Sequence, residues 1–278
     1  MQTEKAAELG FCTGVRRAID ILEKAAQRSG PLSTLGPVVH NQRVMDKLAR
    51  FGIRAVESIE QLEGGTVAIS SHGVSPTVVE RMKDQGLQVV DTTCPFVRRA
   101  QVAARKLADA GFFVVIFGEE SHPEVQGVLG WARGNGLATL ELPRLDSAVK
   151  RIGILSQTTQ SFSSFTAFVS SFAGSYLAPV SELRVVNTIC DATRRRQEAA
   201  LDLARRVDMM LVVGSRRSAN TRRLTEICSA VVDTHLIDGA DEIDALRLGS
   251  DQRIGVTAGA STPDEAIEEV IARLSNAS

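Results

Sequence analysis

Three of the four cysteines lie in similar turns, each leading into a helical stretch: Cys12, Cys94 and Cys190. A polar side chain follows each of them after 28 positions, in a second type of turn that carries His40, His122 and Ser218. Equivalent placement in three repeats would bring three thiols to one point, which suits a metal centre. The fourth cysteine, Cys228, lies inside a helical stretch and is expected to be a core residue.

The three thiols favour an iron–sulfur cluster over zinc. Structural zinc sites usually have four ligands, often from CxxC pairs, and this chain has no such pair. Clusters also normally take four thiolates, so three cysteines would leave one iron without a protein ligand. That iron could bind a substrate as a Lewis acid, which predicts chemistry beyond electron storage.

A third type of turn, again between a strand and a helix, adds further polar side chains: His72, Thr158 and Ser261. Together the turns form a dense set of hydrogen-bond donors, and helix N-termini after them would add backbone N–H groups. The set fits an anionic substrate, with a phosphate or diphosphate favoured. We expect it to comprise His40, His72, His122, Ser218, Asn220 and Ser261. His235, in a strand-like run, is expected to be structural.

Glu124 follows His122 by two positions, in the segment SHPEV. A carboxylate at a helix start commonly complements the helix dipole. Inside a cavity beside a metal-bound hydroxyl, it could instead deliver protons as a general acid. The repeat pattern favours this second role.

Strand-like apolar runs alternate with amphipathic helical stretches, which is typical of parallel α/β units. The clearest runs are residues 66–70, 112–118, 151–156, 209–214 and 253–258. The repeats predict three α/β units related by a pseudo-threefold axis, a trefoil around a central cavity that holds the cluster. Their boundaries are expected at 1–93, 94–186 and 187–278, with residues 1–11 closing the third unit as an edge strand.

Composition excludes several classes of protein. A net charge of −1 over 278 residues argues against a general nucleic-acid binder. No apolar run approaches the roughly 20 residues needed to cross a bilayer, and the N-terminus lacks a signal-peptide core. We expect a cytoplasmic protein whose cysteines are not a disulfide framework. Neither a Walker loop nor a dinucleotide-binding glycine pattern is present, so electrons for a reduction would come from an external protein carrier.

Eight ordered motifs, spread from about residue 10 to residue 264, carry a family resemblance: GFCTGVRRAI, VVHN, SSHGVS, TTCPFV, HPEVQG, SQTT, TICDATRRRQ and VTAGAS. The chain resembles the 4-hydroxy-3-methylbut-2-enyl diphosphate reductases, which catalyse the last step of the methylerythritol phosphate pathway of isoprene biosynthesis. The resemblance implies an oxygen-sensitive [4Fe-4S] cluster and the reductive removal of the substrate hydroxyl, giving isopentenyl and dimethylallyl diphosphates. Ferredoxin or flavodoxin would be the electron donor.

By motif, the resemblance implies a role for each candidate residue. The three repeat cysteines would be cluster ligands, Glu124 the proton donor, and Thr158 a neighbour of the substrate hydroxyl. The substrate and diphosphate pocket would be lined by His40, His72, His122, Ser218, Asn220 and Ser261. One departure is Ala219, where the family commonly has a second serine, and Arg216 and Arg217 lie in the same turn.

Two other readings remain open from the sequence. The first is a dehydratase or synthase resembling quinolinate synthase, which also joins three units around a three-cysteine cluster but performs no net reduction. The second is a non-enzymatic iron–sulfur sensor, in which the histidines and Glu124 would have no purpose.

Overall fold

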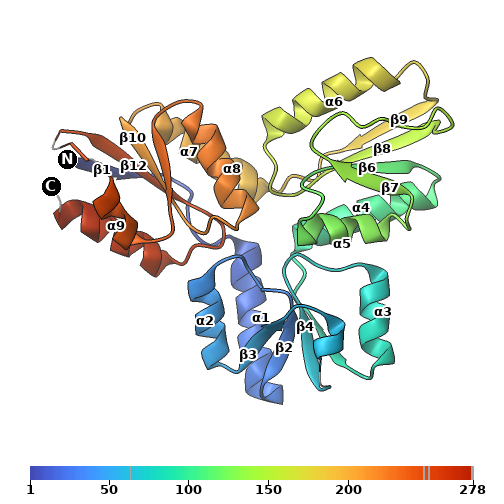
Figure 1. Ribbon diagram of the computed structural model, residues 1–278, viewed down its shortest axis with the longest axis horizontal. Helices are drawn as coiled ribbons and strands as arrows, with labels where there is room; N and C mark the ends of the chain where they lie inside the picture. Colours follow the sequence, from blue (N-terminus) through green and yellow to red (C-terminus); the bar gives the residue numbers. More distant parts are fainter. Residues whose placement is uncertain (63, 247, 250, 277–278) are drawn as a thin grey trace. The chain divides into compact units, whose positions relative to one another are not determined.

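The computed structural model describes residues 1–62, 64–246, 248–249 and 251–276. Within these residues the strands form three four-stranded sheets, and every strand pairing is parallel (Figure 1). The predicted α/β class is therefore confirmed. The chain divides into two compact units. Unit 1 comprises Met1–Arg16, Val39–Lys47 and the segment from Asp191 to the C-terminus, and unit 2 comprises Arg17–Val38 and Leu48–Cys190.

The first sheet of unit 2 has the strand order β3-β2-β4-β5. Its central strand β4 is buried along its whole length, as its apolar run predicted. Ser75 caps the following helix α3, and Pro76 occupies the first turn, where its missing N–H is not needed. The elements are β2 (Leu32–Leu35), β3 (Ile53–Val56), β4 (Thr66–Ile69), β5 (Gln88–Asp91), α3 (Pro76–Asp84), the 3₁₀ helix η1 (Ile59–Gln61) and α1 (Thr13–Ser29), which begins in unit 1.

The second sheet of unit 2, with the order β7-β6-β8-β9, is covered on both faces. Alternate residues of β6 point to opposite faces: Val114 packs with α4 and α5, whereas Val115 packs with the phenylalanines of α6. This burial on both sides explains why its strands are continuous apolar runs. The elements are β6 (Phe113–Phe117), β7 (Gly136–Thr139), β8 (Arg151–Ser156), β9 (Glu182–Val186), α4 (Pro95–Asp109), α5 (Pro123–Trp131) and α6 (Phe162–Tyr176).

The sheet of unit 1 has the order β11-β10-β12-β1. The N-terminal strand β1 pairs with β12 and takes the edge position that β5 and β9 take in the other sheets. An edge position suits its polar, largely exposed residues. The elements are β1 (Gln2–Lys5), β10 (Met209–Val213), β11 (Thr234–Ile237), β12 (Arg253–Ala258), α7 (Asp191–Ala204), α8 (Ala219–Ser229), α9 (Asp264–Asn276) and η2 (Ala240–Ala245), with α2 (Gln42–Arg50) beginning in this unit. The three-unit boundaries near residues 93 and 186 stay a prediction.

In both sheets of unit 2 the topological switch point lies between the two central strands, because the chain continues from them in opposite directions, and the central strands of the unit 1 sheet have the same arrangement, with β1 in the fourth position. These pairs are β2 with β4, β6 with β8, and β10 with β12. Ligand sites of open α/β sheets lie beyond the carboxyl ends of the strands at such points. The turns that carry the candidate residues begin there.

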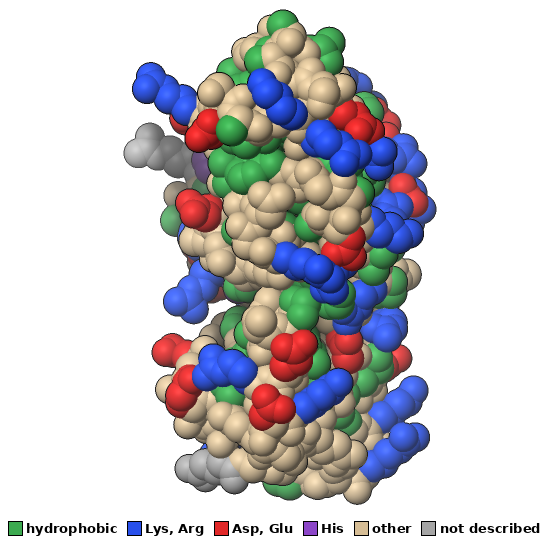
Figure 2. Space-filling model, turned by 90° about the vertical axis from the view of Figure 1, so that its right-hand side faces the viewer, with side chains coloured by type: hydrophobic (Ala, Val, Ile, Leu, Met, Phe, Trp, Pro, Cys, Tyr) green, Lys and Arg blue, Asp and Glu red, His purple; other side chains and the backbone are tan. Residues whose placement is uncertain are grey.

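The surface mixes charges of both signs. On the face in Figure 2, Lys and Arg side chains alternate with Asp and Glu, and apolar side chains form only small groups. Exposed ion pairs such as Arg151 with Glu182 (2.9 Å) belong to this pattern. Among the described residues, no helix has both the length and the apolar content that a membrane crossing requires.

Candidate functional site

Glu124 and Thr158 meet at the switch point of the second sheet in unit 2. Glu124 is the second residue of α5, after β6, and Thr158 lies in the turn after β8. The backbone N–H of Thr158 donates to Glu124 Oε1, and its hydroxyl donates to Oε2, each over 2.7 Å. Both residues are buried, with exposed fractions of 2% and 5%. The carboxyl group is thus held in one orientation and shielded from bulk water.

Burial raises the pKa of Glu124 above the ordinary glutamate value and outweighs the two hydrogen bonds from Thr158, which lower it. The unfolded chain therefore loses this proton at a lower pH than the folded chain does. The stability that this group contributes is lost as the pH rises through the folded pKa.

We therefore expect the free energy of unfolding to fall more steeply with pH, from about 4.5 upward, in the wild type than in Glu124→Gln. Chemical denaturation at several pH values measures the two slopes. Equal slopes would contradict a raised carboxyl pKa.

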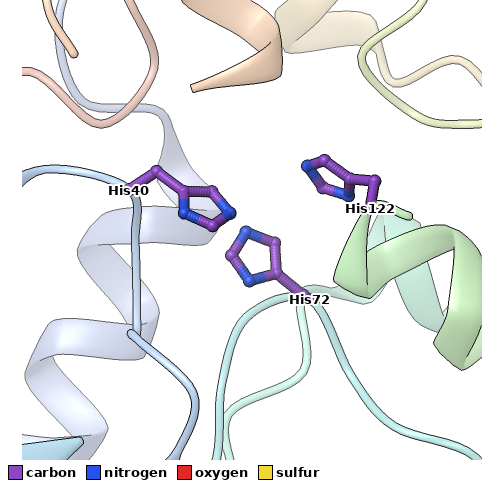
Figure 3. Close-up of side chains that lie close together, drawn as sticks. All are labelled: His40, His72 and His122. Atoms are coloured by element: carbon purple, nitrogen blue, oxygen red, sulfur yellow. The ribbon is translucent and has the colours of Figure 1, made fainter. Parts of the chain in front are cut away.

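His122 caps the same helix with its ring. Its Nδ1 accepts the backbone N–H of Glu124 over 3.2 Å, so the hydrogen-bond pattern assigns Nδ1 as the unprotonated nitrogen. In the neutral ring the proton is then on Nε2, which becomes a donor. His72, in the turn after β4, meets His122 edge to face, with ring centroids 5.4 Å apart (Figure 3). His72 also borders a cavity of about 380 Å³ in unit 2, together with Glu57, Ser70 and Gln126.

Each of the three half-buried repeat cysteines is tied by its backbone to the turn after a central strand. The three N–H groups donate to the carbonyls of Ala260 (from Cys12, 3.2 Å), Ser71 (from Cys94, 3.0 Å) and Thr158 (from Cys190, 3.1 Å). Each acceptor lies two residues beyond its strand, so the three turns are structurally equivalent. By this alignment of the turns, Thr158 is equivalent to Ser71 and Ala260. The next residue, Thr159, is equivalent to His72 and Ser261.

In unit 1 the turns after β10 and β12 present buried polar atoms at two helix N-termini. Ser218 caps α8 by accepting the N–H of Thr221 over 3.3 Å. Among the described residues, neither the amide of Asn220 nor the hydroxyl of Ser261 has a hydrogen-bond partner, although each residue is only 5% exposed. Buried polar groups are normally paired, so these atoms are candidates for binding a polar ligand.

Arg216, in the turn before α8, forms ion pairs at the surface. Arg216 pairs with Glu242 (2.5 Å) and with Asp238 (3.2 Å), and all three side chains are largely or partly exposed. The two carboxylates therefore already balance the positive charge of Arg216. Ala219, the departure noted in the sequence, is buried as the first residue of α8.

The remaining sequence expectations have simple outcomes. Cys228 lies in the core, as predicted, and burial raises the pKa of its thiol to about 11. His235 is in β11, where its ring contacts Asp233 over 3.2 Å.

The candidate residues are divided between the two units. Unit 2 brings together Glu124 with Thr158 and His72 with His122, and it also holds Cys94 and Cys190. Unit 1 holds Cys12, His40, Ser218, Asn220 and Ser261. That both sets line one cavity stays a prediction.

Three further residues near the turns, Thr159, Gln101 and Trp131, were not predicted from the sequence. Thr159 has a buried hydroxyl without a partner among the described residues. Gln101 and Trp131 both donate to the Val74 carbonyl, two residues after His72. One signal was available for Gln101, because a glutamine follows both Cys94 and Cys190 after seven positions.

Known proteins resemble this chain over nearly its full length. A family profile described as LytB protein matches residues 4–275. A protein of Dehalococcoides mccartyi (strain CBDB1), named 4-hydroxy-3-methylbut-2-enyl diphosphate reductase, is 52% identical over 99% of this chain and 98% of its own length. A protein of the same name from Geobacter sulfurreducens is 42% identical, over 99% and 97% of the two chains.

Solved structures agree with these relatives. One, described as (E)-4-hydroxy-3-methyl-but-2-enyl diphosphate reductase, the terminal enzyme of the non-mevalonate pathway, matches with a TM-score of 0.72 and 37% identity, over 99% of this chain and all of its own. The E-1-hydroxy-2-methyl-but-2-enyl-4-diphosphate reductase of Plasmodium falciparum matches with a TM-score of 0.92 and 26% identity, over 99% and 88%. The parallel sheets, the repeated cysteine turns and these matches lead to one assignment: the chain belongs to the LytB family.

Proposed function

We propose that this chain reduces 4-hydroxy-3-methylbut-2-enyl diphosphate to isopentenyl diphosphate and dimethylallyl diphosphate. The observation that carries the proposal is the buried Glu124–Thr158 pair, a shielded carboxyl group with a raised pKa. It occurs in a chain whose relatives bear the name of this reductase. The reaction consumes two electrons and two protons, breaks the carbon–oxygen bond, forms a carbon–hydrogen bond and releases water.

The cysteines fit a [4Fe-4S] cluster by the chemistry of their donor set. Cys12, Cys94 and Cys190 are half-buried, form no disulfide and are held by equivalent backbone bonds. Cys12 Sγ also accepts the N–H of Val15 over 3.4 Å, an acceptor role that suits a thiolate ligand. When bound, the cluster supplies a one-electron relay and a Lewis-acidic iron without a protein ligand. We assign these three cysteines as its ligands.

Glu124 acts as the general acid in this proposal. Because its pKa is raised, the carboxyl group retains a proton that an exposed glutamate would have lost. Thr158 fixes the orientation of the carboxyl group through both of its donors and offers its hydroxyl near the substrate oxygen. Burial excludes bulk water, so the proton passes to the leaving hydroxyl rather than to solvent.

The diphosphate binds to the donors of the turns. Asn220 and Ser261 supply buried groups that have no protein partner among the described residues, and the N-terminus of α8, which has no acidic residue in its first turn, favours negative charge. Ser218 and the Nε2 of His122 add further donors, and His40 and His72 complete the set.

Replacing Asn220 with Ala is expected to weaken binding of the substrate roughly 10- to 100-fold, as for loss of a hydrogen bond to a charged group. Isothermal titration of the reconstituted enzyme measures the dissociation constant. Arg216→Gln is the matched control, since its guanidinium is already paired with Glu242 and Asp238. Unchanged affinity in Asn220→Ala would remove Asn220 from the diphosphate site.

Electrons are proposed to come from ferredoxin or flavodoxin in the cytoplasm. When bound, the cluster would accept electrons one at a time, which suits a one-electron protein carrier rather than a nicotinamide. A reducing compartment also suits cysteines that form no disulfide.

Product analysis separates the three readings of the chain. The anaerobically reconstituted enzyme is incubated with the hydroxylated diphosphate and a reduced electron carrier, and the products are identified by mass spectrometry. We expect isopentenyl and dimethylallyl diphosphates. A dehydrated product without reduction would favour the quinolinate-synthase-like alternative, and absence of turnover with an intact cluster would favour a sensor.

A further inference from the structure

The turn that carries His72 is held at one backbone atom by two helices of unit 2. Trp131 Nε1, at the end of α5, donates to the carbonyl oxygen of Val74 over 3.0 Å. Gln101 Nε2, from α4, donates to the same oxygen over 3.4 Å. One carbonyl therefore joins three elements that are distant in sequence.

The Gln101 side chain is fixed in this position. It is fully buried, and its Oε1 accepts a hydrogen bond from Arg98 over 2.8 Å, so the amide orientation is set from both ends. The Arg98 guanidinium also lies 5.6 Å from the centre of the Trp131 ring. A cation over an aromatic face is attractive, which links the two donors to each other.

Three glycines allow this close approach. Gly73 has φ of +68°, and a Cβ there would overlap the Gln101 amide nitrogen. In α5, a Cβ on Gly127 would lie 3.1 Å from the Gly73 carbonyl oxygen, and one on Gly130 would overlap the Ser75 Cβ. The helix therefore packs directly against the backbone of the turn.

The same elements carry the proposed substrate groups at their other ends. Helix α5 begins at its cap His122 and ends at Trp131, and the turn carries His72 two residues before Val74. Helix α4 begins after Cys94, whose N–H is bonded to the Ser71 carbonyl of the turn. A fixed Val74 carbonyl thus sets the position of His72 relative to both His122 and Cys94.

We propose that Gln101 and Trp131 are positioning residues that hold His72 in place for diphosphate binding. This inference rests on the proposed function, in which His72 contacts the substrate. Displacing His72 weakens binding of the substrate and of the transition state equally, so KM rises while kcat is retained. Supporting side chains that lock a binding group act in this way because binding geometry tolerates little displacement.

Paired glycine substitutions test the packing. Gly130→Ala introduces the overlap with Ser75, whereas Gly174→Ala, in α6, meets nothing within 4 Å. Both changes add the same helix-favouring methyl group, so their difference isolates the contact with the turn. We expect the dissociation constant for inorganic diphosphate to rise about tenfold in Gly130→Ala and to be unchanged in Gly174→Ala.

Two further variants test the hydrogen bonds to the Val74 carbonyl. They also keep the inference testable if Gly130→Ala does not fold. Trp131→Phe keeps a ring without the donor, and Gln101→Met keeps the length without the amide. Each is expected to weaken diphosphate binding about fivefold, as for one lost hydrogen bond, with the cluster absorption spectrum unchanged. Trp131 is the only tryptophan, so its emission in Gln101→Met gives an independent readout of the turn.

A double-mutant cycle with His72→Asn decides whether Gln101 and Trp131 affect binding through His72. We expect no further loss of diphosphate affinity when Trp131→Phe or Gln101→Met is added to His72→Asn. An equal loss with and without His72, or no loss in either single variant, would overturn the positioning role alone. Unchanged affinity in His72→Asn itself would overturn both the inference and the proposed role of His72.

Discussion

Replacing Glu124 with Gln is expected to lower kcat by about 10²- to 10⁴-fold, the usual contribution of a positioned general acid. Gln has nearly the same shape and cannot donate a proton of carboxylic acidity. Its oxygen can still accept the Thr158 N–H, and its amide can donate to the Thr158 hydroxyl, which is free to rotate. The change should therefore leave the packing around α5 intact.

The measurement compares anaerobic steady-state turnover, substrate affinity and the cluster absorption spectrum of the two proteins. We expect the spectrum and the affinity to be retained while turnover falls. Glu120→Gln is a suitable control, because Glu120 is an exposed carboxylate in the loop just before α5, four residues before Glu124. Full turnover in Glu124→Gln would reject the acid role.

Replacing Cys94 or Cys190 with Ser is expected to abolish stable assembly of the cluster, because a serine hydroxyl is a poor substitute for a thiolate ligand of iron. The backbone N–H groups of Cys94 and Cys190 donate to the carbonyls of Ser71 and Thr158. A side-chain substitution leaves these two hydrogen bonds, and the helices that begin there, unchanged. The fold should therefore remain while the metal is lost. Circular dichroism checks the fold.

Iron and acid-labile sulfide per chain, measured after anaerobic reconstitution, report the effect. The matched control is Cys228→Ala, since Cys228 is buried in the core, away from the repeated turns. We expect a full complement of iron in the control and a strongly reduced complement in the two serine variants. Wild-type iron content in Cys94→Ser would exclude this cysteine as a ligand.

The repeat was the part of the molecule that the sequence allowed us to predict. Apolar runs identified β4, β6, β8, β10 and β12, because strands buried on both faces leave a continuous apolar signal. The equal spacing from cysteine to polar turn reflects a real equivalence, since His40, His122 and Ser218 each lie five residues beyond the end of β2, β6 or β10. The α/β class followed from these features, and the family resemblance came from the eight ordered motifs; both are confirmed.

Tertiary contacts set the limits of that prediction. The sequence could not reveal that Thr158 rather than Thr159 shares the register of Ser71, because the three turns differ in side-chain type. Nor could it reveal the Gln101–Trp131 contact with Val74, which depends on glycines that let α5 approach the turn. The composition of β1 is likewise a weak signal for a strand, because β1 is polar and forms a strand by pairing with β12.

The number of electrons consumed per substrate distinguishes a reductive dehydroxylation from a simple elimination of water. Dithionite-reduced methyl viologen, a one-electron carrier, is mixed anaerobically with the reconstituted enzyme and a limiting amount of the hydroxylated diphosphate. We expect two viologen radicals to be oxidised for each hydroxyl removed, with isopentenyl and dimethylallyl diphosphates as products. Substrate conversion without oxidation of viologen would contradict a reductive dehydroxylation by this protein.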